Sequence, residues 1–396
     1  MNIKRLTILL FVLAVLFVAP GVCHAFAGGS GTSSDPYLVA TPEDLNNIRN
    51  NLTASYKLTA DIDLSGQNWV PIGTSAAPFK GTLDGDGHVI RNLYINQTAD
   101  YAGLFAVISG GTVKNLRLEG VNVQGGDYTG GLVGCNVAST ITNCSVAGSV
   151  SGSGTYTGGL VGWNNCGTIT SCYSTGSVSS GYSGGTGGLV GWNTGTGTIT
   201  SCYSTGSVST RSSYTGGLVG YNDTSGTINN CFSTGSVSSS SSHTGGLVGY
   251  NKGKITNCYS AGKVSSGSTP FGGFAGYSNG TVTNCFWDTQ ASGQPTSAAG
   301  TGKLTLLMKK ASNYGGFDFN TVWQIDEGTS YPYLKNLPKP ASVVVGTAGD
   351  NDVGGGTGTS SDPYLVANPH HLDTVRWELT ASYKLTADID LSGQNW

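Results

Sequence analysis

The sequence predicts an all-β fold, a parallel β-helix (β-solenoid) whose coils are about 28–29 residues long. The first indication is composition. Gly supplies 63 of 396 residues, well above its average share of about 7%. Charged residues make up only 10%, against about 25% in a typical soluble domain. The second is that each segment holds short β-branched stretches between Gly, Asn and Ser, which favour turns over helices. The third is a repeat: Gly-Gly-Leu-Val-Gly, or once Gly-Gly-Phe-Ala-Gly, begins at Gly130, Gly158, Gly187, Gly216, Gly245 and Gly272.

The composition also excludes several classes of protein. The formal net charge is −3, so the chain lacks the excess of basic residues that displaces counterions from phosphates, and no nucleic-acid partner is expected. The low charge is equally unlike that of a disordered acidic tail. Because Gly, Ser and Thr are poor helix formers, an ordinary helical enzyme is not expected either.

Residues 1–27 have the pattern of a secretory signal peptide. Lys4 and Arg5 precede the apolar run Leu6–Val18, and Ala25-Phe26-Ala27 fits the small-x-small cleavage pattern. The run is shorter than the roughly 20 residues that a membrane-spanning helix needs. We therefore expect a secreted or cell-surface protein with no membrane span beyond the signal peptide.

Residues 28–100 are expected to form an N-terminal cap and the first coils. Within them, residues 41–52 predict a short capping helix, because Thr41 can serve as the N-cap and Pro42 suits the first helical position. Such a helix would cover the open end of the solenoid, where unpaired strand edges otherwise recruit other chains.

Acidic residues of these first coils are the candidates for a metal site. Hard cations favour such oxygen clusters, and Asp84-Gly85-Asp86-Gly87 superficially suggests a calcium loop. Asp and Gly are also turn formers, so a tight turn between two strands is the simpler interpretation, and neither a metal nor a cofactor is expected. The residues concerned are Asp61, Asp63, Asp84, Asp86 and His88.

Residues 101–287 hold the repeat array, in which equivalent positions should stack about 4.8 Å apart, the spacing of neighbouring strands. An inward aliphatic ladder is predicted at Ile141, Ile169, Ile199, Ile228, Ile255 and Val282. A structural cysteine ladder keeps the same spacing at Cys144, Cys172, Cys202, Cys231, Cys258 and Cys285. Side chains on adjacent parallel strands point the same way, which strains a disulfide torsion, so we expect reduced, packed thiols.

Two further ladders are candidates for recognition. Aromatic rings recur at Trp163, Trp192, Tyr221, Tyr250 and Tyr277, with Cys135 at the same position of the first repeat. Facing outward, these rings could bind a ligand by stacking on sugars; facing inward, they are core, and bulges leave both options open. Thr-x-Thr pairs recur at Thr140/Thr142, Thr168/Thr170, Thr198/Thr200 and Thr281/Thr283, interrupted at Asn229 and Lys254. They suit either an ice-binding face or ordinary solvent-facing strands.

These motifs resemble the GLUG repeat family. In the typical repeat the Gly-rich run is followed by an aromatic residue and Asn, and then by Thr-Ile-Thr-Asn/Ser-Cys-Tyr/Phe-Ser-Thr-Gly-Ser-Val. The family occurs in bacterial surface and adhesin-like proteins and beside the protease domain of immunoglobulin A metallopeptidases, and the resemblance implies a right-handed β-helix. The stretches Asp35–Leu64 and Phe79–Leu93 resemble the segment that often precedes such arrays.

The remaining chain divides into three parts. Residues 288–337 are predicted to close the far end of the solenoid, with a short helix at Leu304–Ala311 and the segments Trp323–Ile325 and Tyr331–Leu334 over the end. Residues 338–357 form a Gly-rich linker. Residues 358–396 are a truncated copy of the N-terminal module, since Thr380–Trp396 repeats Thr53–Trp69 residue for residue. A half module cannot bury its own core, which suggests a fragment or an early stop in a tandem array.

No catalytic residues are predicted. Between Tyr128 and Cys285 a single carboxylate, Asp223, is present, and one carboxylate cannot form an acid–base pair. His370-His371 lacks the spacing of a zinc protease helix. We therefore predict a non-enzymatic surface protein, adhesin-like or stalk-like, whose ladders contact cell-surface or extracellular glycans or proteins. The alternatives are an ice-binding protein that uses the Thr-x-Thr ladders and a polysaccharide-active enzyme.

Overall fold

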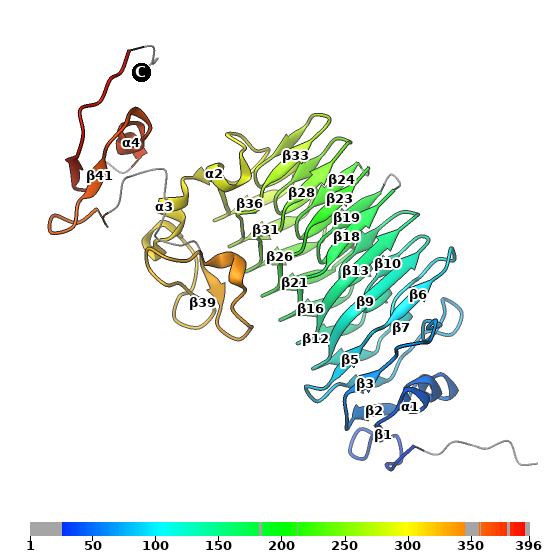
Figure 1. Cartoon of the computed structure of the whole chain (residues 1–396). Coiled ribbons are helices and arrows are strands. Elements are labelled where there is room, and N and C mark those ends of the chain that lie inside the picture. Colours follow the sequence, from blue (N-terminus) through cyan, green and yellow to red (C-terminus); the bar gives the residue numbers. More distant parts are fainter. Residues whose placement is uncertain are drawn as a thin grey trace, which may run out of the picture.

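The protein is a rod-shaped β-solenoid, in which parallel sheets run along the rod and consecutive coils stack upon one another (Figure 1). The computed structural model describes residues 26–181, 184–211, 213–344, 356, 358–377 and 381–392. The predicted all-β solenoid is confirmed. Residues 1–25 of the predicted signal peptide lie outside the described residues.

Four sheets build the rod. Sheet A has ten strands: β1 (Tyr37–Val39), β2 (Ser55–Leu58), β4 (Thr82–Asp84), β8 (Thr112–Lys114), β12 (Thr140–Thr142), β16 (Thr168–Thr170), β21 (Thr198–Thr200), β26 (Thr227–Asn229), β31 (Lys254–Thr256) and β36 (Thr281–Thr283). Sheet C has seven: β7 (Phe105–Ser109), β11 (Val133–Val137), β15 (Val161–Asn165), β20 (Val190–Thr194), β25 (Val219–Asn222), β30 (Val248–Asn251) and β35 (Ala275–Ser278). Sheet D has six: β10 (Thr129–Gly130), β14 (Thr157–Gly158), β19 (Gly185–Gly187), β24 (Tyr214–Gly216), β29 (Thr244–Gly245) and β34 (Phe271–Gly272).

Sheet B, with 15 strands, forms the remaining side of the rod. Its strands are β3 (Ile62–Asp63), β5 (Val89–Arg91), β6 (Tyr94–Asn96), β9 (Arg117–Gly125), β13 (Ser145–Gly152), β17 (Tyr173–Ser174), β18 (Ser177–Ser180), β22 (Tyr203–Ser204), β23 (Val208–Thr210), β27 (Phe232–Ser233), β28 (Val237–Ser239), β32 (Tyr259–Ser260), β33 (Val264–Ser266), β37 (Phe286–Asp288) and β38 (Thr301–Lys303). One coil therefore passes through sheets D, C, A and B in turn.

The corner between sheets A and B is made by one residue in the left-handed backbone region. Asn143 has φ 53°, and Ser171, Ser201 and Asn230 each have φ 52°. Asn tolerates this region better than most residues, because its short polar side chain bonds locally. The residue that follows each corner is a cysteine of the ladder, so the turn directs the thiol into the rod.

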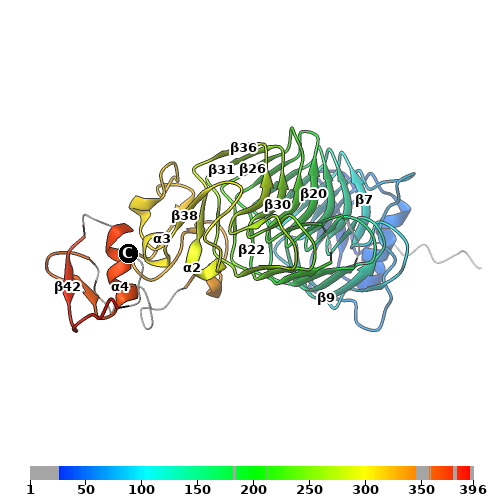
Figure 2. The same ribbon diagram turned by 90° about the horizontal axis from the view of Figure 1, so that it is seen from above.

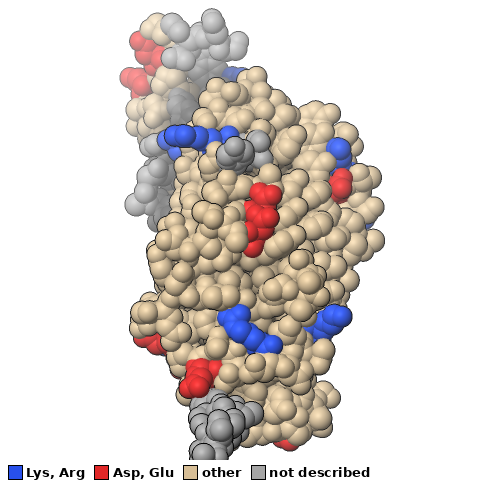
Figure 3. Space-filling view, turned by 90° about the vertical axis from the view of Figure 1, so that its right-hand side faces the viewer, with Lys and Arg blue, Asp and Glu red and all other residues tan. Residues whose placement is uncertain are grey.

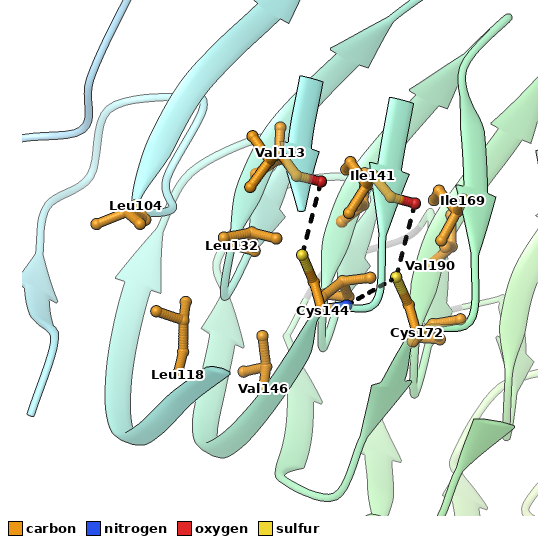
Figure 4. Packing of buried hydrophobic residues seen from close by; sticks show 14 of the residues in the cluster. Leu104, Val113, Leu118, Leu132, Ile141, Cys144, Val146, Ile169, Cys172 and Val190 are labelled. Atoms are coloured by element: carbon orange, nitrogen blue, oxygen red, sulfur yellow. Dashed lines mark hydrogen bonds between the residues drawn. The ribbon is translucent and has the colours of Figure 1, made fainter. Parts of the chain in front are cut away.

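The core of the rod consists of stacked Leu, Ile, Val and Cys side chains (Figure 4). The Cys144 thiol donates to the Thr142 carbonyl at 3.3 Å, and the Cys144 backbone N–H donates to Cys172 Sγ at 3.4 Å, a pattern that recurs along the ladder. All six ladder cysteines are buried and free. Burial raises the pKa of Cys144, Cys172, Cys202 and Cys258 well above the ordinary thiol value, so these thiols are neutral packing groups.

The predicted capping helix is present as α1 (Pro42–Asn47), followed by a 3₁₀ turn at Ile48–Asn50. Thr41 is the N-cap, and its side chain and that of Asp44 form a reciprocal capping box. Leu45 and Ile48 are buried against the first coil. The α-helix is shorter than residues 41–52 because the chain tightens into the 3₁₀ turn before it enters β2.

The segment after β37 covers the far end of the rod with its first part, while its second part lies elsewhere than predicted. Residues 289–303, with α2 (Thr289–Ser292) and β38, cover the end of the last coil, where Ser297 Oγ accepts the backbone N–H of Ala275 at 2.8 Å. The hairpin of β39 (Trp323–Gln324) and β40 (Tyr333–Leu334) instead lies along the side of the rod. It packs there against a column of apolar rings on sheet B: Tyr203, Phe232, Tyr259 and Phe286.

Tyrosine hydroxyls on sheet B help to fasten this lateral segment. Tyr203 Oη donates to the Pro338 carbonyl at 3.1 Å, and Tyr259 Oη donates to the Pro332 carbonyl at 2.5 Å. The predicted helix at Leu304–Ala311 contains α3 (Thr305–Met308) and the start of a 3₁₀ turn, Ala311–Asn313. A last 3₁₀ turn, Ala341–Val343, ends the segment.

The second copy of the N-terminal module forms a small unit of its own. It comprises β41 (Tyr364–Val366), α4 (Pro369–Thr374), a 3₁₀ turn at Val375–Trp377 and β42 (Tyr383–Leu385). β41 and β42 pair in parallel, as β1 and β2 do in the first copy. In Figure 2 this unit lies at the opposite end of the molecule from α1.

Candidate functional site: an aromatic band on sheets C and D

The aromatic ladder lies on the outer side of sheet C, with its rings partly exposed to solvent. Trp163 pairs in register with Trp192, and the next coils continue with Tyr221, Tyr250 and Tyr277. Four of these rings are half-buried, and Tyr277, with 37% of its surface exposed, is the most accessible. The structure thus selects the outward orientation from the two that the sequence left open.

A buried asparagine ladder beneath the rings holds them in register. An asparagine follows each ring from Trp163 to Tyr250 and points inward. Its amide donates to the next coil, as Asn164 Nδ2 does to Asn193 Oδ1 at 2.7 Å and Asn193 Nδ2 to Asn222 Oδ1 at 2.8 Å. The same amides also donate to backbone carbonyls of the turn that follows, such as Gly167 O. These side chains are fully buried, and satisfied buried networks of this kind specify a unique register.

Sequence reasoning missed a second column of rings beside the first, on the chain entering sheet D. Its members are Tyr101, Tyr128, Tyr156, Tyr214 and His243. Tyr128 stacks on Trp163 at 5.2 Å between ring centroids, and Tyr156 stacks on Trp192 at 4.3 Å. The signal was available, because an aromatic residue recurs two positions before most Gly-Gly pairs. We call the two columns together the aromatic band.

Several residues of this second column have an uncommon backbone conformation. Tyr101 has φ 63°, Tyr128 57°, Tyr156 59° and His243 59°. A bulky side chain in this region costs free energy and persists where its surroundings impose it. Here the left-handed turn places each ring against the neighbouring ladder, so the strain is offset by aromatic packing.

Stacking decides which parts of the rings a ligand can reach. Trp163 and Trp192 lie 5.5 Å apart with an interplanar angle of 14°, and Tyr221 and Tyr250 lie 5.1 Å apart at 16°. Rings stacked in this way cover one another's faces along the rod, and their edges and hydroxyls point to solvent. Tyr277 is the last ring of the ladder. Within the ladder it stacks on Tyr250 alone, with 4.7 Å between the ring centroids.

The aromatic band carries almost no charge. Partial burial raises the pKa of Tyr101, Tyr128 and Tyr156 and lowers that of His243, so these groups are neutral near pH 7. Charged residues border the band at Asp100 and Asp127, near Tyr101 and Tyr128, and at Lys252, whose Nζ lies 5.6 Å from the Tyr250 ring centroid. One face of the rod in Figure 3 likewise shows only scattered charged residues. A surface of this chemistry suits an uncharged polar ligand better than an ionic one.

The Thr-x-Thr ladder occupies the outer side of sheet A. The strands align Thr140 with Thr168 and then Thr198, so the side chains form regular rows. Lys254 is exposed within the outer row, where it follows Thr227, and Lys114 stands in the row of Thr142. These long charged side chains interrupt the regular threonine surface that ice binding would require.

The acidic residues of the first coils form ion pairs rather than a cation site. Asp84-Gly85-Asp86-Gly87 is the predicted turn, in which Asp84 Oδ1 accepts the Asp86 N–H at 2.9 Å. Their side chains pair with lysines, Asp84 with Lys114 at 3.1 Å and Asp86 with Lys57 at 3.0 Å. Among the described residues no group of three or more His, Cys, Asp or Glu could hold a metal ion.

Asp61 is the most strongly shifted of these carboxylates. It accepts the backbone N–H of Val89 at 3.0 Å and bonds Arg91 at 2.9 Å, and His88 Nδ1 lies 3.3 Å away. These contacts, the Val89 bond first, lower its pKa to about 2. His371 of the His370-His371 pair has a structural role as well, because its Nδ1 accepts the Ala367 N–H at 3.2 Å near the start of α4.

Fold and surface define a repeat protein of the β-solenoid class whose candidate site is a band of stacked rings. Residues 42–148 match the N-terminal region of M26 IgA1-specific metallo-endopeptidases, and residues 153–179, 182–209, 211–238 and 240–265 each match the GLUG motif. The chain therefore carries GLUG repeats next to an M26-type N-terminal region, which confirms the predicted resemblance.

Relatives share parts of this arrangement. A stretch of 156 residues is 38% identical to the "Putative Gly-rich membrane protein" of Evansella cellulosilytica, covering 34% of this chain and 18% of that protein. A stretch of 123 residues is 39% identical to Halomucin of Haloquadratum walsbyi, covering 27% of this chain and 1% of Halomucin. This chain thus spans less than a fifth of either relative.

A solved structure has the same fold over most of the chain. It is described as a "putative immunoglobulin A1 protease" from Bacteroides ovatus, with a TM-score of 0.58 and 25% identity, covering 78% of this chain and 95% of that one. No helix in the described part of our chain is long and apolar enough to span a membrane.

Proposed function

We propose that this chain is a non-enzymatic, stalk-like module of an exported surface protein. The observation that carries the proposal is the continuity of the rod: ten strands of sheet A and the buried Asn and Cys ladders stack without a break. Each coil is held by its neighbours, so the array is a stiff spacer whose length grows with the number of repeats. The names of the relatives, a membrane protein and a halomucin, support a surface location.

The non-enzymatic part of the proposal has a direct test, because two comparisons point to IgA1 proteases. The purified chain is incubated with human IgA1 and with zinc, and the IgA1 heavy chain is followed by electrophoresis. We expect the heavy chain to stay intact. Cleavage that a chelator abolishes would contradict the proposal and assign a catalytic role to this region.

A second role, adhesin-like contact with neutral glycans, is supported by the aromatic band. The band is outward-facing, uncharged over most of its length and repeated on every coil, so weak contacts would multiply through valency. Stacking covers most ring faces, so we expect a sugar ring to stack on Tyr277. The other rings of the band would contact the glycan through their edges and hydroxyls.

A glycan array tests this second role. We expect the wild-type chain to bind neutral glycans and the Tyr277→Ala variant to lose at least tenfold in apparent affinity. Tyr94→Ala is a matched control, because Tyr94 lies on sheet B and is equally exposed at 38%. Absence of binding by the folded wild type, or equal losses in both variants, would leave the chain as a spacer.

A further inference from the structure

The chain contains two copies of one head segment, and the tyrosine at its centre needs an apolar cover. Thr32–Ala40 and Thr359–Ala367 are identical in sequence, with Tyr37 and Tyr364 in equivalent positions. In each copy the tyrosine lies at the start of the first strand and pairs in register with a second tyrosine, Tyr56 or Tyr383. The two heads therefore present the same aromatic surface to whatever precedes them.

In the first copy the cover comes from the chain directly upstream. The Phe26 ring stacks on the Tyr37 ring at 4.6 Å and also contacts the Tyr56 ring at 5.5 Å. The second copy has Val353 at the position that corresponds to Phe26, so its sequence supplies no aromatic ring there.

In the second copy the cover comes from the end of the first module. Tyr364 is buried in one cluster with Leu306 and Leu307 of α3, and Tyr383 borders the same cluster. Lys310 Nζ lies 5.0 Å from the Tyr364 ring centroid, within the range of a cation–π contact. In Figures 1 and 2 the second head lies at the same end of the molecule as α3.

The helix α3 has two apolar sides with different partners. Met308 is fully buried in the cluster that the hairpin around Trp323 forms with the rings of sheet B. Leu306 and Leu307 contribute nothing to that cluster and are buried with the second head instead. Without that head, two adjacent leucines would face water on a surface that is otherwise built largely of Ser, Thr, Asn and Gly, and their exposure would be unfavourable.

We propose that α3 and Lys310 form a docking surface for the head of the module that follows in the same chain. In this joint Leu306 and Leu307 cover Tyr364, as Phe26 covers Tyr37 in the first head. The joint couples consecutive modules. The segment after the linker is thereby held against the first rod and does not move independently of it. The joint is independent of glycan binding.

Hydrogen exchange of the full chain, followed by mass spectrometry, tests the joint. The reporter amides are those that hold the second head together: Tyr364 N–H, bonded to the Ser382 carbonyl, and Thr386 N–H, bonded to the Val366 carbonyl. In the wild type we expect both to be protected. In Leu307→Asp we expect exchange in peptides covering 364–386 to be at least tenfold faster, because a carboxylate cannot be buried against Tyr364.

Two controls make the result decisive. Tyr37→Ala changes the same tyrosine in the first head and should leave exchange in 364–386 unchanged. Leu307→Met keeps an apolar side chain against Tyr364, so the amides of 364–386 should stay protected from exchange. The proposal is overturned if 364–386 is unprotected in the wild type, or if Leu307→Asp exchanges like the wild type. A loss that spreads to the amides of sheet A would mean that α3 stabilises the first rod instead. Glycan-array results bear on neither outcome.

Discussion

The two heads of this chain have nearly the same sequence but very different environments. Leu58 on β2 is fully buried, whereas its counterpart Leu385 on β42 is 64% exposed; Leu64 is buried, and its counterpart Leu391 is 38% exposed. The difference lies in the neighbouring coil: β2 pairs with β1 on one side and with β4 on the other, while within the described residues β42 pairs with β41 alone. A solenoid coil therefore acquires its core from its neighbours.

The largest expected effect compares equivalent leucines. Leu58→Ala should destabilise the first rod by about 2–5 kcal/mol, because it leaves a cavity among fully buried side chains. Leu385→Ala should change stability by less than about 0.5 kcal/mol, because that side chain is mostly in water. Urea denaturation followed by circular dichroism measures both. Equal effects would mean that burial differs less between the two heads than their environments indicate.

A smaller effect is expected from breaking the asparagine ladder, where a neighbour on each side again decides the outcome. Asn193→Ala removes the donor to Asn222 and the acceptor of Asn164, and should cost roughly 2–3 kcal/mol. Asn136 begins the ladder, and its Oδ1 has no partner in the described part of the chain. Asn136→Ala should therefore cost about 1 kcal/mol less. The midpoints of urea unfolding give the comparison, and the reverse order would refute it.

The smallest effect concerns the response to acid. The pKa of Asp61 is lowered to about 2, so its stabilising contribution is complete above the unfolded value near 3.9 and disappears as pH falls through about 2. The melting temperature of the wild type should thus fall between pH 4 and pH 2, and Asp61→Asn should flatten that slope. Its counterpart Asp388 makes no ion pair within the described residues, and Asp388→Asn removes the same formal charge, so this variant is the control for net charge. A parallel shift in both variants would point to net charge alone.

Much of the fold was predictable because the repeat itself encodes it. Residues such as Ile141, Ile169 and Ile199 recur at coil spacing, and identical positions on stacked parallel strands must lie side by side. The capping helix was also predictable, since Thr41, Pro42 and Asp44 satisfy the first turn by local bonds. Its exact end was not, because the 3₁₀ turn depends on where β2 begins.

The site was less predictable. The aromatic ladder was found from its spacing, but the column at Tyr128 and Tyr156 was missed, because no regular alternation assigns a ring on a left-handed corner to either face. The hairpin around Trp323 was placed at the end of the rod by its position in the sequence. It lies instead on Tyr203 and Tyr259, residues far earlier in the chain.

By itself, then, the sequence determined the coil, the inward Ile and Cys ladders, the first cap and the absence of a carboxylate pair between Tyr128 and Cys285. These features follow from local chemistry and from a repeat period, both of which can be read along the chain. The tertiary structure alone decided which way the rings face, how they cover one another, which side the closing hairpin protects and what covers Tyr364. The reason is physical: each of these depends on apolar surface that exists only after the coils have stacked, and residues distant in sequence compete to bury it.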